Sequence, residues 1–183
     1  EQEEEVEELG GGQPAKVDPP VLIMLRDAMI AAQGGDRQLV DVTLSCFSND
    51  GMSLFADEVD AAIGHMLLKR RKTMQQGLKE LAGAVDKLLK SAVTDCISHS
   101  CSGAKVIWQA AGKLNRLTRK TVVDYGTHIK YEAMKSLEVG GVTIHTELNA
   151  FLSTWKLRGR AEAGKPFGEL FLRLSKISGH DEF

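Results

Sequence analysis

The stretch SLFADEVDAAIGHMLLKRRKTMQQGLKELAGAVDKLLKSAVTDCIS, residues 53–98, decides the fold of this chain. Its apolar residues recur at steps of three and four, and it contains no proline. This spacing places the apolar side chains on one face of an α-helix. The pattern continues almost unbroken, apart from a gap across Arg70, and therefore predicts a single helix from about Ser53 to Ser98.

A helix of this length would be about 68 Å long and would project from a compact domain, so its apolar stripe needs a partner. We interpret the stripe as a short coiled-coil seam through which copies of the chain associate. Gly77 offers an alternative, because a break there would fold the stretch into a hairpin within one chain. The residues predicted to carry oligomerisation are Leu78, Leu81, Val85 and Leu88.

The remaining sequence predicts an all-α fold, a helical bundle with one or two long central helices and short C-terminal helices. No proline occurs between Val21 and Lys165, which is typical of a helical protein. Gly140 and Gly141 are expected to end the second long helix. Helices are predicted at 21–33, 104–137, 147–157 and from Pro166 onward, and residues 39–47 are predicted as an extended segment or a short helix.

The composition divides the chain into three parts. Residues 1–20 form an acidic tail with six glutamates in the first eight positions, and this segment is expected to be disordered. Residues 21–139 form the long-helix bundle and oligomerisation region, and residues 140–183 a small helical subdomain that packs on it. Outside residues 1–8 the chain carries an excess of about four positive charges. The tail either solvates the chain, docks on a basic partner, or masks the basic face of the chain itself.

Clusters of basic residues are the most suggestive polar feature. They would attract an acidic protein or the phosphates of a nucleic acid. The alternatives are that they form the solvated outer faces of a bundle, or that the first four are a nuclear-import signal. The candidate binding residues are Lys69, Arg70, Arg71, Lys72, Arg116, Arg119, Lys120, Arg158 and Arg160.

No catalytic or metal-binding signature stands out, so we predict a protein that is not an enzyme and needs no cofactor or metal. The segment Gly159–Lys165 follows a phosphate-loop spacing, but Pro166 replaces the hydroxyl residue, which indicates a linker. Cys96, His99 and Cys101 lie close together, but no second close pair completes a tetrahedral metal site, although Cys46 or His65 could be brought near by the fold. Three cysteines make a disulfide framework unexpected and favour an intracellular protein of the cytoplasm or nucleus. No apolar run is long enough to span a membrane.

These observations predict a protein–protein interaction module, an adaptor or scaffold that forms homo-oligomers and binds a protein partner. A helical protein that binds nucleic acid is the alternative. The layout, with Glu1–Glu8, Leu78–Leu88 and Phe151–Ile177 as acidic start, oligomeriser and C-terminal module, resembles phosphoproteins of negative-strand RNA viruses. That resemblance implies an acidic start that chaperones nucleoprotein and a C-terminal module that tethers polymerase to the nucleocapsid.

Overall fold

Seven α-helices and a small antiparallel sheet make up the part of the chain that the structure, a computed structural model, describes, namely residues 19–33, 37–91, 101–119 and 128–177. The helices are α2 (Pro20–Gln33), α3 (Arg37–Leu44), α4 (Asn49–Met66), α5 (Arg71–Ser91), α6 (Ser102–Thr118), α8 (His145–Leu157) and α9 (Gly164–Leu174). The strands are β2 (Ile129–Glu132), β3 (Ser136–Val139) and β4 (Val142–Thr143), and a short 3-10 helix, η3 (Ala161–Ala163), precedes α9.

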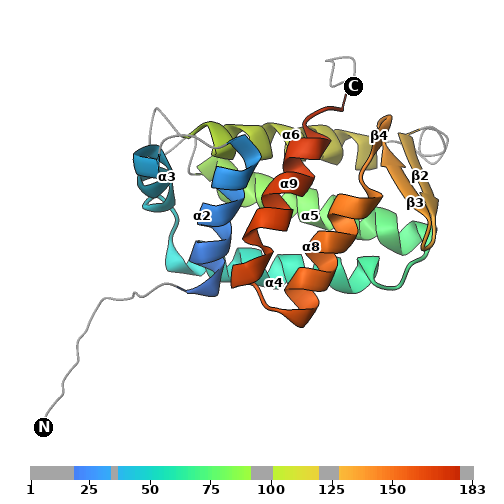
Figure 1. Ribbon diagram of the computed structural model, residues 1–183, viewed down its shortest axis with the longest axis horizontal. Helices are drawn as coiled ribbons and strands as arrows, with labels where there is room; N and C mark the ends of the chain where they lie inside the picture. The colour runs from blue at the N-terminus through green and yellow to red at the C-terminus, as the bar shows by residue number, and fades with distance from the viewer. Residues whose placement is uncertain (1–18, 34–36, 92–100, 120–127, 178–183) are drawn as a thin grey trace, which may run out of the picture.

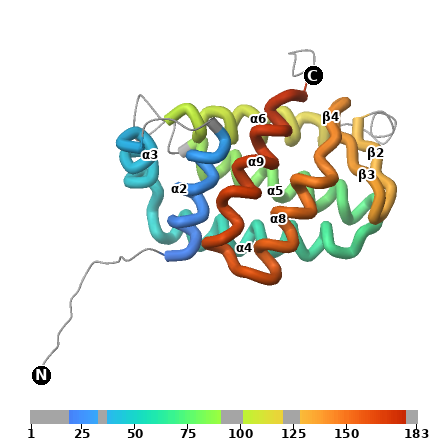
Figure 2. The backbone as a smooth tube through the Cα atoms, viewed as in Figure 1, coloured from blue at the N-terminus to red at the C-terminus, as the bar shows by residue number. Residues whose placement is uncertain are grey.

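The helices form two layers that cross each other (Figure 1). Helices α2, α9 and α8 lie side by side in one layer, and α4, α5 and α6 run behind them in the other. The sheet covers one end of the molecule and α3 lies at the opposite end, as the tube in Figure 2 also shows. The apolar faces of both layers meet in one continuous core.

The predicted single helix over residues 53–98 is wrong, because the chain reverses direction between α4 and α5. These two helices make the most extensive helix pair of the described chain. The reversal occupies residues 67–70, where Lys69 has a left-handed backbone with φ of 57°. Thr73 helps to start α5, since its Oγ1 accepts a hydrogen bond of 3.2 Å from the Arg70 amide. The break therefore falls at the gap in the apolar pattern and not at Gly77.

Gly77 instead lies where α4 and α5 approach each other most closely. A Cβ atom at this position would lie 2.3 Å from Cγ of Met66 and 2.7 Å from the carbonyl oxygen of Ala62. Gly168 has the same role between α9 and α2, because its Cβ would lie 2.3 Å from the carbonyl oxygen of Ala28. These glycines are required by close helix packing and do not break their helices.

The three strands correct the all-α prediction and the helix expected over residues 104–137. Helix α6 ends at Thr118, and the chain later forms the sheet β2-β3-β4. Ile129 pairs with Val139, and Val139 pairs with Val142 across a two-residue turn. That turn is Gly140–Gly141, with φ of 56° and 85°, the left-handed geometry that a tight hairpin needs. The glycine pair connects strands and does not end a helix.

Four phenylalanines mark the centre of the core, where α4, α8 and α9 meet. The ring of Phe167 lies 6.3 Å from that of Phe55, 5.1 Å from that of Phe151 and 4.7 Å from that of Phe171. Such spacings are favourable for aromatic pairs. The other sequence-predicted helices are confirmed as α2, α8 and α9, and the ambiguous segment 39–47 contains the short helix α3.

Candidate binding groove

A groove of about 390 Å³ lies at the end of the molecule that carries the sheet. Three segments that are distant in sequence form it: the reversal between α4 and α5, the β2–β3 hairpin, and one face of α8. Its lining includes Met66, Leu67, Lys69, Met74, Tyr131, Met134, Leu137, His145, Leu148, Asn149, Leu152, Ser153, Lys156 and Leu157.

Large apolar side chains are exposed to solvent around this groove. Leu157 is 81% exposed and Met134 72% exposed, and Leu68, which stands between two lining residues, is 56% exposed. These three account for half of the exposed large hydrophobic side chains in the described chain. Solvent-exposed apolar groups gathered at one concave site indicate a surface that another molecule covers.

Positive charge accompanies the apolar rim. Lys69 and Lys156 line the groove, and no aspartate or glutamate is among its lining residues. The exposed residues Arg70, Arg71 and Lys72 follow Lys69 directly. In the described chain none of these five basic side chains forms an ion pair. The groove therefore offers cations that no neighbouring carboxylate neutralises.

The position of this basic cluster gives α5 no electrostatic benefit. Arg71 and Lys72 occupy the first turn of α5, which contains no acidic residue. The N-terminal end of a helix carries partial positive charge, so a cation there is destabilising. An anion at the same place would instead stabilise the helix by about 0.3–1 kcal/mol. A bound anionic group would remove this repulsion.

Two residues at the groove have a backbone conformation that is unfavourable for their type. Lys69 has φ of 57° and Met134 φ of 66°, the only positive values among described residues other than glycine. The two side chains also touch, with Nζ of Lys69 lying 3.7 Å from Sδ of Met134. Left-handed backbone costs an L-residue about 1–2 kcal/mol. Strain that collects at one place is typical of functional sites.

Tyr131 and His145 supply the remaining polar groups of the groove. Partial burial raises the pKa of the Tyr131 hydroxyl above its ordinary value of 10.0, because the phenolate would lose solvation. Nε2 of His145 lies 3.1 Å from Nδ2 of Asn149, one helical turn along α8. Tyr131 is thus a neutral hydrogen-bonding group that an approaching carboxylate would meet without charge repulsion.

The residues predicted to form an oligomerisation seam do not lie on the surface of the chain. Leu78 and Leu81 are fully buried, Val85 is 1% exposed and Leu88 8% exposed. They belong to the core that α5 shares with its neighbours α4 and α6. The apolar stripe is therefore covered within one chain, and association of copies through these four residues stays a prediction.

The other predicted basic residues have separate roles. The Arg160 guanidinium donates to the Asp60 carboxylate, which also accepts a 2.7 Å hydrogen bond from Nε1 of Trp155. Arg158 forms an ion pair of 3.7 Å with Glu162. Both arginines are thus partnered within the chain. The exposed Arg116 and Arg119 do not line the groove, and Lys120 lies outside the described residues.

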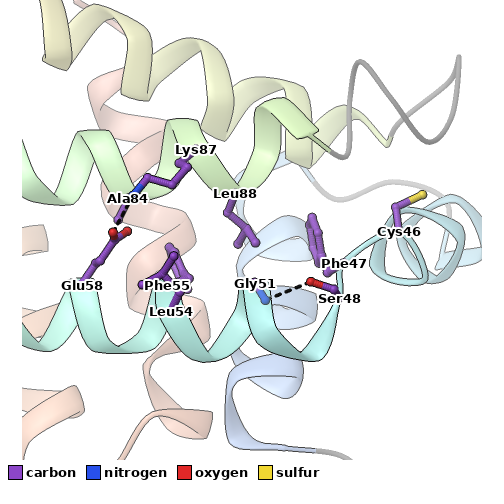
Figure 3. A pocket seen from close by; sticks show the side chains of 10 residues that line it. All are labelled: Cys46, Phe47, Ser48, Gly51, Leu54, Phe55, Glu58, Ala84, Lys87 and Leu88. Atoms are coloured by element: carbon purple, nitrogen blue, oxygen red, sulfur yellow. Dashed lines mark hydrogen bonds and ion pairs between the residues drawn. The ribbon is translucent and has the colours of Figure 1, made fainter.

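A second, smaller cavity of about 190 Å³ lies between α4 and α5 near the end of α3 (Figure 3). Its polar groups already satisfy each other: Nζ of Lys87 lies 2.6 Å from Oε2 of Glu58, and the Gly51 amide donates to Oγ of Ser48 at 2.9 Å. Cys46 lines this cavity and is disulfide-bonded, whereas Cys101 is a free buried thiol.

The described residues contain no group of three or more His, Cys, Asp or Glu side chains that could hold a metal ion. Cys96 and His99 of the proposed cluster lie outside those residues. Gly164, the second glycine of the phosphate-loop spacing, packs against α2, where its Cβ would lie 2.5 Å from the Met24 carbonyl oxygen. Within the same ranges no helix combines the length and apolar character needed to cross a bilayer.

Comparison with protein families, with curated proteins and with solved structures found no match to this chain.

Proposed function

We propose that this chain is a non-enzymatic interaction module that binds an acidic, partly apolar peptide segment of a partner protein. One observation carries the proposal: unpaired lysines and exposed apolar side chains surround the same groove, and no carboxylate lines it. A segment with glutamate or aspartate beside leucine-like residues would complement both features. Its carboxylates would pair with Lys69 and Lys156, and its apolar side chains would cover Met134 and Leu157.

The geometry favours a peptide over a nucleic acid. Proteins that hold single strands stack bases on aromatic side chains. Tyr131 is the only aromatic residue in the lining. Trp155 is 7% exposed and donates a hydrogen bond to Asp60, and Trp108 donates a hydrogen bond of 2.8 Å to Asp86. The two tryptophans therefore stabilise the fold and do not offer free ring faces at the groove. The viral phosphoprotein layout depends on a central helical oligomeriser, whereas the residues assigned to it are buried in the bundle.

Binding is tested by fluorescence anisotropy with a short labelled peptide of alternating glutamate and leucine. Two further peptides separate the contributions, one of glutamate alone and one of serine and leucine. We expect the mixed peptide to bind most tightly, with an affinity that falls as salt rises but does not vanish, because the apolar contacts are not screened.

Charge reversal locates the site. The double variant Lys69→Glu with Lys156→Glu is expected to weaken binding at least about tenfold, equivalent to about 1.4 kcal/mol. Lys105→Glu with Lys165→Glu changes the net charge equally at two exposed positions outside the groove and is the matched control. Equal weakening by both variants, or tighter binding of a single-stranded RNA oligonucleotide than of the peptide, contradicts the proposal.

A further inference from the structure

The first nine residues of the chain, EQEEEVEEL, have the chemistry that the groove complements. Six of them are glutamates, and Val6 and Leu9 add apolar side chains three positions apart. Gly10, Gly11 and Gly12 follow, and glycine imposes little restriction on the path of a chain. The same chain therefore contains both an acidic, partly apolar segment and a basic, partly apolar groove.

The connection is long enough for one to reach the other. Helix α4 begins next to the start of α2 (Figure 1) and ends at Met66, which lines the groove; its 18 residues span about 27 Å. Residues 10–19, which join the acidic segment to Pro20, span about 33 Å when extended. A short flexible connection of this kind gives an effective concentration in the millimolar range. A contact between the segment and the groove whose dissociation constant lies below this concentration would then be formed most of the time.

On this basis we propose that the segment Glu1–Leu9 occupies the groove of its own chain and competes with the partner peptide. The proposal rests on the proposed function, because it assigns the same groove a resident competitor. Its glutamates pair with Lys69 and Lys156, and Val6 or Leu9 covers the exposed side chains of Met134 and Leu157. A partner binds by displacing this segment. Because the segment is present at a millimolar effective concentration, only a partner peptide that binds the groove more tightly than the segment does stays bound.

Carbodiimide cross-linking of the full chain tests this contact directly, since the reagent joins a carboxylate to an amine only when the two touch. We expect mass spectrometry to find glutamates 1–8 joined to Lys69 and Lys156, and these links to disappear at high salt. Mixing isotope-labelled with unlabelled chains identifies links within one chain. Links spread evenly over the exposed Lys105 and Lys165 as well, links only between chains, or no links to Lys69 and Lys156, overturn the proposal.

A full-length variant with all six glutamates of residues 1–8 changed to glutamine keeps side-chain size and removes the charge. We expect this variant to bind the glutamate–leucine peptide about tenfold more tightly than the parent chain, because the competitor is lost. Equal binding by parent and variant overturns self-occupancy and leaves the proposed function intact. If neither the parent chain nor the variant binds the peptide, the proposed function is overturned. The cross-links alone then decide whether Glu1–Leu9 occupies the groove.

Discussion

At the scale of single residues, Tyr131 gives the groove a pH-dependent signature. Its pKa is raised by partial burial, so above pH 10 the unfolded chain loses the phenolic proton while the folded chain keeps it. The folded state then binds more protons, and stability falls as pH rises from the unfolded pKa through the folded one. We expect Tyr131→Phe to remove this part of the alkaline loss in urea denaturation series and to change stability at neutral pH by less than about 0.5 kcal/mol.

The ionisation itself is measured from the ultraviolet absorbance of phenolate. The chain has two tyrosines, and Tyr125 is present in both proteins, so the parent titration minus that of Tyr131→Phe isolates Tyr131. An acidic peptide in the groove is expected to raise the Tyr131 pKa further, because a nearby carboxylate disfavours the phenolate. An unchanged difference titration with saturating peptide would place the bound peptide elsewhere.

Substitution of Lys69 is expected to change stability and peptide binding in opposite directions. Glycine adopts the left-handed backbone of this residue without the Cβ penalty, although it is more flexible in the unfolded chain. We therefore expect Lys69→Gly to raise the free energy of unfolding by about 0.5–1 kcal/mol. The same substitution is expected to weaken binding of the glutamate–leucine peptide, because a cation at the groove is lost. A variant that is less stable than the parent would show that the left-handed geometry is not strained.

At the scale of secondary-structure elements, the crossing of α4 and α5 depends on Gly77. Alanine there places a methyl group against Met66 and Ala62, and overpacking of this kind costs about 1–3 kcal/mol. Gly83, in the same helix, has open space where its Cβ would lie. We expect Gly77→Ala to be destabilised by that amount and Gly83→Ala to be stabilised by up to about 1 kcal/mol, both measured by urea denaturation. Equal stabilisation of the two variants would mean that α4 and α5 pack less closely at Gly77 than in the structure.

The elements show which signals the sequence contains and which it does not. Apolar spacing identifies the buried faces of α4 and α5, and the gap across Arg70 marks their junction. The left-handed turn at Lys69 is not readable, because lysine and arginine are good helix formers and the position lacks glycine. The pair Gly140–Gly141 between Val139 and Val142 is a hairpin signal, but the helical periodicity upstream favours interpreting it as a helix end.

The groove is harder to predict because it exists only after folding. Its three segments come from residues 66–74, 131–137 and 145–157, and no local pattern connects them. Of the basic residues predicted to bind an acidic ligand, only Lys69 lines the groove. Arg160 has the same charge, yet it is paired with Asp60, which is 100 positions away in sequence. The sequence shows the number of basic residues but not which of them lack a partner.

At the scale of the whole molecule, substitution at Leu81 distinguishes a core position from an interface between copies. The side chain is fully buried within one chain, so Leu81→Asp places an unpaired carboxylate in the apolar core. Such burial costs several kcal/mol, comparable with the total stability of a small domain, which is typically about 5–15 kcal/mol. We expect the variant to lose cooperative unfolding and most of its helical circular dichroism. A folded variant with lower mass by light scattering would instead identify Leu81 as an intermolecular contact. Leu157→Asp, which alters an 81% exposed side chain, is the control and is expected to fold with stability within about 0.5 kcal/mol of the parent.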